Sequence, residues 1–278
     1  MTQDWESQFN PRRAVPEAEE FVAKSKVKSD QAHQKFGDIE QLRYGPGPLA
    51  NLNLRRSSQP GQPLFVFIHG GYWRGRDKDD FGYIFNALEP SNANMVILNY
   101  DLCPKVTVRQ ISTQIQQALL WLHTQAESLG FDADRIFVAG HSAGAHLVAM
   151  VLAQAPAEFS LPDGLIRKAY LISGIYELSP VLKISVNQEI RLVPDDVEPL
   201  SPVNFPGSRN TAYDIIVGQA EPQGWVEQSI LFSEHIQSQT IQTSLTILPE
   251  RHHYSILQDL ETPDGVLARR FLNDLQGD

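Results

Sequence analysis

Residues 135–147 read RIFVAGHSAGAHL, and this stretch decides the fold. It opens with an apolar run typical of a buried strand and closes with the start of a helix rich in alanine and leucine. The residues GHSAG at 140–144 match the pattern G-x-S-x-G. Between a strand and a helix, this pattern is typical of a nucleophile elbow, which raises a serine hydroxyl above the sheet. The stretch therefore predicts Ser142 as a nucleophile at a helix N-terminus, where the helix dipole favours a developing anion.

The same alternation of strand and helix continues along the chain. Short apolar runs that we expect to be strands lie at 64–68, 95–98, 136–139, 169–172, 215–217 and 245–248. Helical patterns occupy 108–126, 143–153, 225–236 and 265–275. Strands that are apolar throughout are typical of a parallel sheet covered by helices on both faces. We therefore expect the α/β class, with a single doubly wound, mostly parallel sheet of the α/β-hydrolase fold.

Two segments fall outside this alternation. Residues 1–40 are expected to form an N-terminal arm with one weakly amphipathic helix near 17–34, ahead of the main domain at 41–278. Residues 177–206 follow a strand and are rich in proline, serine and acidic residues. Insertions of this length are either functional lids or plain surface. We interpret 177–206 as a small lid.

Composition and charge limit the partners. The formal net charge is −10 over 278 residues, which argues against the clustered basic face of a nucleic-acid-binding protein and against an anionic membrane surface. No apolar run approaches the ~18 residues of a membrane span, and the N-terminus lacks the apolar segment of a secretory signal. With Cys103 as its single cysteine, the chain is expected in the cytoplasm. The partner is then a small-molecule substrate, and the oligomeric state stays open, a homodimer included.

The sequence HGGYW at 69–73 follows the first apolar strand directly. Acyl transfer creates an oxyanion, and backbone N–H groups aimed at that anion stabilise the transition state. In lipases and esterases, a glycine-rich loop after this strand supplies such groups together with the amide after the nucleophile. We expect the donors to be Gly71, Tyr72 and Ala143, with Gly70 allowing the turn.

A general base must follow the nucleophile, beyond the end of a late strand. The pair His252-His253 lies four residues past the run at 245–248. We take His253 as the base and keep His252 as the alternative.

The acid of such a triad should follow the strand at 215–217. Glu221 lies there, whereas Asp214 lies at the start of that strand, on the wrong edge of the sheet. Asp195 and Asp196, in the insertion, are weaker candidates. A glutamate is chemically sufficient, because the acid only has to orient the imidazole and stabilise its cation.

The sequence predicts neither a metal nor a cofactor. No group of Cys, His and Asp has metal-ligand spacing, and no glycine-rich phosphate loop precedes a helix.

With these residues in place, the chain resembles the kynurenine formamidase (arylformamidase) family of α/β-hydrolases over nearly its whole length. The motif at 69–73 matches the family's HGGxW. Further similar stretches lie at 9–12, 15–16, 99–104, 228–229 and 253–254.

The resemblance implies a triad of Ser142, Glu221 and His253, and hydrolysis of an N-formyl arylamine such as N-formylkynurenine. Family members often carry aspartate where this chain has Glu221. The family pattern also includes relatives with esterase activity, so a small carboxylesterase acting on short-acyl aryl esters is the alternative. A non-catalytic ligand receptor on the same fold is a third reading, which the retained nucleophile, base and acid disfavour.

Aromatic residues accompany each of these motifs. Tyr72 and Trp73 follow the expected oxyanion glycines, Trp225 follows the acid, and Tyr254 adjoins the base. We expect these four rings to bind the aryl part of the substrate, although His69 and Trp73 are also good candidates for purely structural roles.

Overall fold

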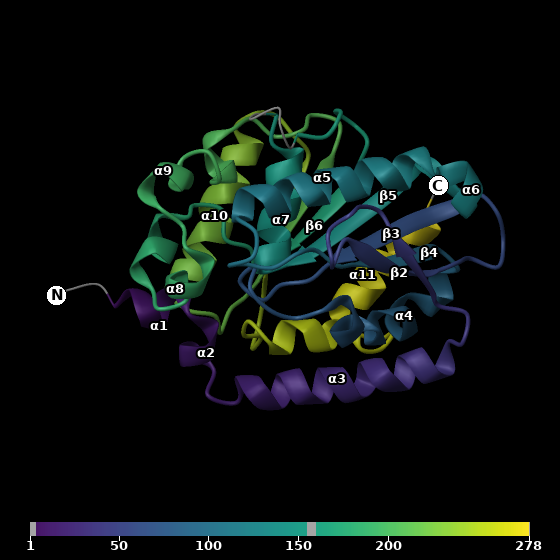
Figure 1. Ribbon diagram of the computed structural model, residues 1–278, viewed down its shortest axis with the longest axis horizontal. Helices are drawn as coiled ribbons and strands as arrows, with labels where there is room; N and C mark the ends of the chain where they lie inside the picture. The colour runs from purple at the N-terminus through teal and green to yellow at the C-terminus, as the bar shows by residue number, and fades with distance from the viewer. Residues whose placement is uncertain (1–3, 155–159, 278) are drawn as a thin grey trace.

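The computed structural model describes residues 4–154 and 160–277, and within them the chain forms one eight-stranded sheet (Figure 1). Its order is β1-β2-β4-β3-β5-β6-β7-β8. Strands β3 to β8 pair in parallel, and β1 and β2 add an antiparallel edge. The strands are β1 (Glu40–Arg43), β2 (Asn51–Arg55), β3 (Gln62–Ile68), β4 (Asn94–Leu98), β5 (Phe131–His141), β6 (Lys168–Ile172), β7 (Ala212–Gly218) and β8 (Thr243–Leu248).

Helices cover both faces of this sheet. Figure 1 shows α5, α7 and α10 on one face and α3, α4 and α11 on the other. The α-helices are α1 (Trp5–Phe9), α2 (Pro11–Ala14), α3 (Ala18–Lys35), α4 (Tyr83–Leu88), α5 (Val108–Thr124), α6 (Ala126–Leu129), α7 (Ala143–Leu152), α8 (Asn187–Ile190), α9 (Pro194–Val197), α10 (Gln223–Gln237) and α11 (Val266–Gln276). Short 3-10 helices are η1 (Lys78–Phe81), η2 (Glu89–Ser91), η3 (Ser179–Lys183), η4 (Pro202–Asn204) and η5 (Ser255–Leu260).

The expected fold class is therefore confirmed, and each of the six predicted strands is present as one of β3 to β8. The two antiparallel strands, β1 and β2, were not predicted. Their sequences, EQLR and NLNLR, mix polar and apolar residues, and β1 is half exposed at the edge of the sheet. They lack the continuous apolar pattern of strands in a parallel sheet covered on both faces.

Alternating side chains of each strand enter two separate cores. Leu64, Val66 and Ile68 of β3 pack with the helices α5 and α7 on one face. Phe65 and Phe67, which point the other way, pack with α4 and α11. This period of two, repeated in each inner strand, fixes which face each helix covers.

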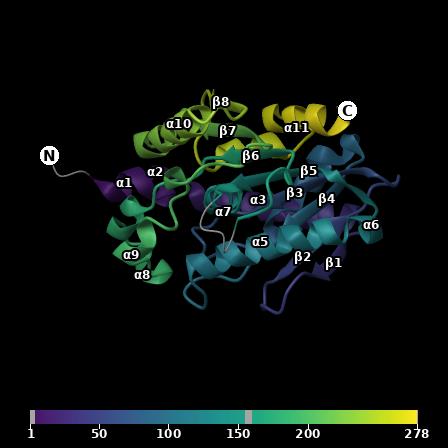
Figure 2. The same ribbon diagram turned by 90° about the horizontal axis from the view of Figure 1, so that it is seen from above.

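The N-terminal segment lies against the main body along much of its length (Figure 2). Helix α3 contacts α4 and η1, and α1 contacts α10. The contact of α1 includes Phe9, which packs on the ring of Trp225 at a centroid distance of 6.4 Å, and the Gln8 side chain, which accepts a hydrogen bond from the Gly224 N–H at 3.0 Å. Segment 1–40 therefore shares an interface with the element that follows β7.

Residues 177–206 form η3, α8, α9 and η4, and they bury several apolar side chains in the core on the α7 side. His146 of α7 anchors this segment, because its Nε2 lies 2.8 Å from the carbonyl oxygen of Leu200. The same imidazole packs edge-on against Trp73. Whether 177–206 moves as a lid stays a prediction.

In the part of the chain that the structure describes, no helix is long and apolar enough to cross a membrane.

The buried His146 predicts a pH dependence of stability. Burial lowers its pKa from 6.5 to about 4, so the folded chain binds a proton less readily than the unfolded chain. Its contribution is present above pH 6.5 and is lost as the pH falls toward 4. We expect the free energy of unfolding to fall between pH 7 and pH 5 by roughly 2 kcal/mol more than in His146→Gln, whose amide can still donate to Leu200. Urea unfolding of both proteins at the two pH values measures this, and equal losses would contradict it.

Candidate active site

The loop between β5 and α7 holds Ser142 in a strained conformation. Its φ of 57° and ψ of −118° lie outside the regions that a non-glycine residue ordinarily adopts. Its N–H donates to the carbonyl of Ile172 on β6 at 2.8 Å. The flanking glycines are required by space: a Cβ on Gly140 would lie 2.4 Å from the Gly144 carbonyl oxygen, and one on Gly144 would lie 2.1 Å from the Ile68 carbonyl oxygen. The turn has the geometry of a nucleophile elbow.

Three side chains from three different strand ends are in hydrogen-bond contact. The Oγ of Ser142 lies 3.0 Å from Nε2 of His253, and Nδ1 of His253 lies 2.7 Å from Oε2 of Glu221. All three residues are buried. A hydroxyl, an imidazole and a carboxylate in this order can transfer the hydroxyl proton to the ring while the carboxylate stabilises the resulting cation.

The carboxylate of Glu221 is itself held by two further donors. Its Oε1 accepts hydrogen bonds from the backbone N–H of Gly218 at 2.8 Å and from the Oγ of Ser173 at 2.5 Å. Ser173 was not predicted from the sequence, although it follows β6 directly and so lies at the same sheet edge. Its φ of 50° is again in the left-handed region. Ser173 therefore fixes the rotamer of Glu221.

The alternative acids and the alternative base lie elsewhere. Asp214 is buried at the opposite end of β7, where it pairs with Arg270 and Ser244. Asp195 is exposed, and Asp196 caps its own short helix by accepting from the Val193 N–H. The ring of His252 is half-exposed and accepts from the N–H of Tyr254 through Nδ1. None of these four candidates contacts Ser142 in the structure.

A second histidine supports the base. His141, the variable residue of the elbow, is within 2.9 Å of the His253 carbonyl oxygen through Nε2. Burial lowers the pKa of His141 well below its ordinary value, and the neighbouring His253 imidazole lowers it further. The ring is therefore neutral at pH 7 and can donate an N–H to that carbonyl. This contact, like that of Ser173, comes from a residue for which we predicted no role.

The loop after β3 lies directly beside Ser142. A Cβ on Gly70 would lie 3.0 Å from the Cβ of Ser142, which places the glycine in van der Waals contact with the nucleophile loop. The next residues, Gly71 and Tyr72, have φ values of 110° and 52°. Ala143 is the first residue of α7, so its N–H has no acceptor within the helix. Gly71, Tyr72 and Ala143 are the residues that the sequence predicts as oxyanion donors; Gly71 and Tyr72 line the same cavity as Ser142, and Ala143 follows Ser142 directly.

A cavity of about 150 Å³ opens at Ser142 and His253. That is the size of an engineered cavity that binds benzene. Tyr72 and Tyr254 line it, as the sequence predicts for two of the four aromatic residues. Phe21 of α3 and Phe81 of η1 also line it, and neither was predicted because neither adjoins a catalytic motif.

The other two predicted rings are placed differently. Trp73 is fully buried, packs edge-on against His146, and does not line the cavity. Trp225 is also buried and lies behind the site, with its ring 4.6 Å from that of His253. The left-handed backbone at Tyr72 and Trp73, with φ of 52° and 54°, turns successive side chains to different sides. The expectation that Trp73 and Trp225 contact substrate is therefore wrong for this structure, and both pack behind the wall.

Among the described residues, no group of three or more His, Cys, Asp or Glu side chains could hold a metal ion.

Comparisons with known proteins agree with the α/β-hydrolase fold. A family model described as alpha/beta hydrolase fold matches residues 65–200. Kynurenine formamidase from Danio rerio is 26% identical over 96% of this chain and 92% of its own length. The Drosophila melanogaster kynurenine formamidase is 26% identical over 99% of this chain and 93% of its own. A crystal structure from Silicibacter sp. TM1040, provisionally named a thioesterase, superposes with a TM-score of 0.83 at 26% identity, covering 96% of this chain and 98% of its own.

Replacing the elbow serine tests the nucleophile. We expect Ser142→Ala to fold normally but to lower kcat by several orders of magnitude, because the atom that would form the covalent bond is gone. Circular dichroism controls for folding, and turnover of an N-formyl arylamine and of p-nitrophenyl acetate gives the rates. A purified variant that kept a tenth of wild-type activity would show that another residue is the nucleophile.

Replacing the acid tests the support of the base. Glu221→Gln keeps the shape but removes the charge that faces Nδ1 of His253. We expect kcat to fall by on the order of 10³–10⁴, as for other triad acids. Asp195→Asn and Asp196→Asn are matched controls, expected within about twofold of wild type. A loss below about fivefold in Glu221→Gln, with a large loss in either control, would move the acid to 177–206.

Proposed function

Because this chain is an enzyme with the α/β-hydrolase fold and of the arylformamidase type, we propose that it hydrolyses an N-formyl arylamine such as N-formylkynurenine to formate and the free amine. The observation that carries the proposal is the hydrogen-bonded series of Ser142, His253 and Glu221, of which Ser142 and His253 line a small cavity. Similarity to kynurenine formamidases over nearly the full chain supports the choice of substrate class.

The proposed reaction has two steps. His253 takes the proton of Ser142 through Nε2 as Oγ attacks the formyl carbon. The negative charge that develops on the formyl oxygen is stabilised by the N–H groups of Gly71, Tyr72 and Ala143. Protonated His253 then gives its proton to the departing arylamine nitrogen, which leaves a formyl ester on Ser142.

Water completes the cycle. His253, now neutral, takes a proton from a water molecule that attacks the formyl ester, and the same oxyanion donors act again. Collapse of this second intermediate returns the proton to Ser142 and releases formate. Throughout, Glu221 stabilises the imidazolium form of His253 and holds Nδ1 in place, with Ser173 and Gly218 holding the carboxylate.

The size and lining of the cavity support a short acyl group on an aryl leaving group. Tyr72, Tyr254, Phe21 and Phe81 offer apolar ring surface, and an aryl group that covers it is stabilised by ~25 cal/mol per Å² buried. A space of about 150 Å³ accommodates one aromatic ring.

The alternative is hydrolysis of short-acyl aryl esters by the same residues. The provisional thioesterase name of the Silicibacter protein supports this alternative function, because oxygen esters and thiol esters are cleaved by the same two steps. Hydrolysis of an ester depends less on proton donation by His253, because an alkoxide or phenoxide leaves more readily than an amide nitrogen.

A substrate panel separates the two functions. We expect kcat/KM for N-formylkynurenine to exceed that for p-nitrophenyl acetate, and short-acyl aryl substrates to exceed alkyl esters of C8 or C10 acids by at least tenfold. Initial rates measured with one enzyme preparation give both ratios, with Ser142→Ala as the blank. A profile that rises with acyl chain length would contradict the proposal and indicate a lipase-like esterase.

A further inference from the structure

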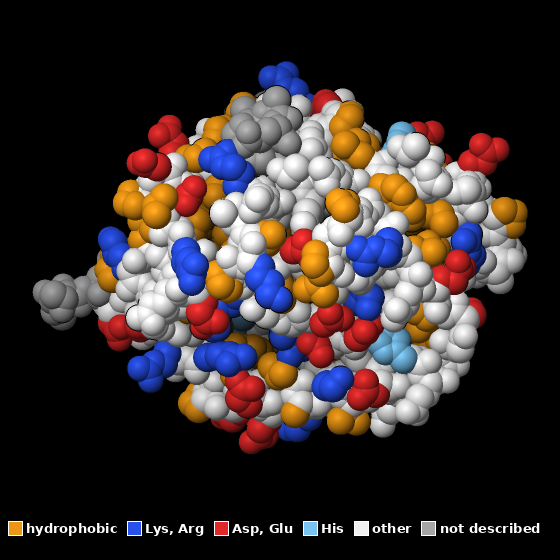
Figure 3. All heavy atoms as spheres, in the orientation of Figure 1, with side chains coloured by type: hydrophobic (Ala, Val, Ile, Leu, Met, Phe, Trp, Pro, Cys, Tyr) orange, Lys and Arg blue, Asp and Glu red, His pale blue; other side chains and the backbone are white. Residues whose placement is uncertain are grey.

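The cavity beside Ser142 is lined by arginines, each of which is paired with a carboxylate outside the lining. Among the described residues that line it are Arg12, Arg74 and Arg76, and no aspartate or glutamate. The outer surface differs: on the face in Figure 3, basic and acidic side chains are interspersed, and the chain as a whole carries a formal charge of −10. A hollow lined by charges of one sign focuses the electric field and concentrates ligands of the opposite sign.

Arg76 is the most enclosed of the three arginines. Its side chain is 16% exposed, compared with 26% for Arg74 and 56% for Arg12. A guanidinium that has lost most of its hydration binds an anion more strongly than one at the surface.

Three contacts hold the Arg76 side chain over the oxyanion loop. Its Nε lies 3.2 Å from Oδ2 of Asp80, and its guanidinium lies over the ring of Phe81, 5.1 Å from the centroid. Its stem covers Gly71, where a Cβ would come within 2.9 Å of the Arg76 Cγ. Because the ion pair is made through Nε, the two Nη groups keep their donors for another acceptor.

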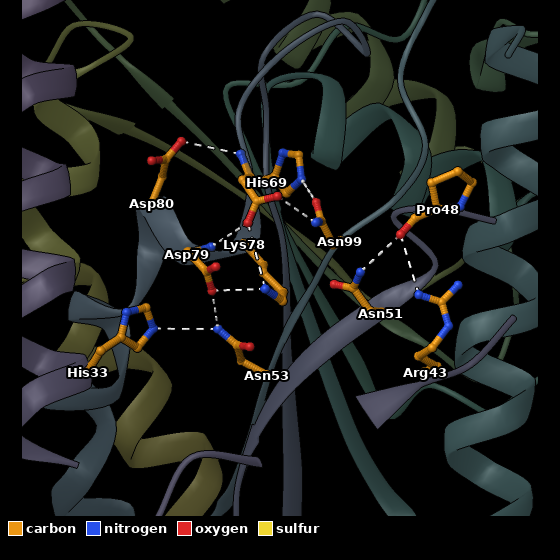
Figure 4. Close-up of polar contacts among 11 residues, drawn as sticks. His33, Arg43, Pro48, Asn51, Asn53, His69, Lys78, Asp79, Asp80 and Asn99 are labelled. Carbon is orange, nitrogen blue, oxygen red and sulfur yellow. Dashed lines mark hydrogen bonds and ion pairs between the residues drawn. The ribbon is translucent and has the colours of Figure 1, made fainter. Parts of the chain in front are cut away.

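The carboxylate that holds Arg76 belongs to a hydrogen-bonded framework (Figure 4). Asp80 accepts from the N–H of Asp77 at 3.2 Å, and Asp77 accepts from the side chain of Asn99 at 2.8 Å. The Oδ1 of Asn99 lies 3.0 Å from Nε2 of His69, the residue directly before the oxyanion glycines. Arg76 is thus fixed to the same framework as the loop that contacts Ser142.

We propose that Arg76 binds a carboxylate of the substrate at the end remote from the scissile bond, and that the enzyme thereby selects N-acyl arylamines that carry an anionic group. The fork of a guanidinium matches the two oxygens of a carboxylate and forms paired, charge-assisted hydrogen bonds. The inference rests on the proposed function, and it adds to it the charge of the substrate and the residue that recognises that charge.

Two substrates that differ by one group test the proposal. N-formylkynurenine carries a carboxylate, and N-formylkynuramine formylated on the ring amine is identical except that it lacks this group. The measured quantity is the ratio of their kcat/KM values. We expect wild type to favour the carboxylate by at least tenfold, Arg76→Gln to lower the ratio at least tenfold, and Arg76→Lys to give an intermediate ratio.

Arg55 offers a matched control away from the cavity. It too is an arginine of low exposure, 18%, that faces a carboxylate, Asp38, and lies over a phenylalanine ring, Phe36. Arg55→Gln should keep the wild-type ratio within twofold. A wild-type ratio near one would overturn the proposal. So would an unchanged ratio in Arg76→Gln, including the case in which both rates fall together, because that result would assign Arg76 to support of the oxyanion loop alone.

Failure of the proposed function gives a different result. If wild type cleaves aryl esters but neither formamide, the formamidase assignment is wrong. The role of Arg76 is then decided by the ratio for 4-acetoxybenzoate, whose carboxylate lies at the far end of the ring from the ester, against phenyl acetate in the same variants, with the same tenfold criterion.

Discussion

The close approach of α7 to the end of β3 is the constraint on which the site depends. Gly144, in the first turn of α7, lies so near the Ile68 carbonyl that a methyl group would come within 2.1 Å of its oxygen. Any side chain there would push the helix from the sheet and separate Ser142 from Gly70. The strain at Ser142 persists because strands on both sides and the helix above it over-determine the turn. The Ser142 turn and the loop after β3 are therefore positioned by one packing contact.

The parallel sheet then supplies the other groups. In such a sheet the carboxyl ends of the strands meet at one edge, so residues far apart in sequence converge there. Ser142 follows β5, Ser173 follows β6, Glu221 follows β7 and His253 follows β8. The hydrogen bonds that join these four side chains run from Ser142 after β5 to His253 after β8, and then back through Glu221 after β7 to Ser173 after β6. Each of these residues lies just beyond the carboxyl end of a different strand. The buried sheet holds these strand ends at fixed distances from one another.

This regularity explains what the sequence could predict. The ends of the strands can be read from local apolar runs, so Ser142, Glu221 and His253 could be predicted to lie at one edge of the sheet, where the structure shows them in hydrogen-bond contact. Side-chain direction inside the irregular loop could not be read, because left-handed backbone at Tyr72 and Trp73 breaks the strand period. Contacts of the N-terminal segment also could not be predicted from the sequence, because α3 is only weakly amphipathic. Its packing depends on surfaces that exist only after the sheet has formed.

The N-terminal helices also bear on how the site comes into being during synthesis. Gln8 accepts its hydrogen bond from Gly224, 216 residues further along the chain, and Phe21 packs against His252. Tyr72 donates to the carbonyl of Phe9 from the middle of the sequence. A ribosome releases the first helices long before it has made their docking surface on α10 and the loop after β8. The part of the cavity wall formed by residues 10–25 is thus translated before the surface on which it docks.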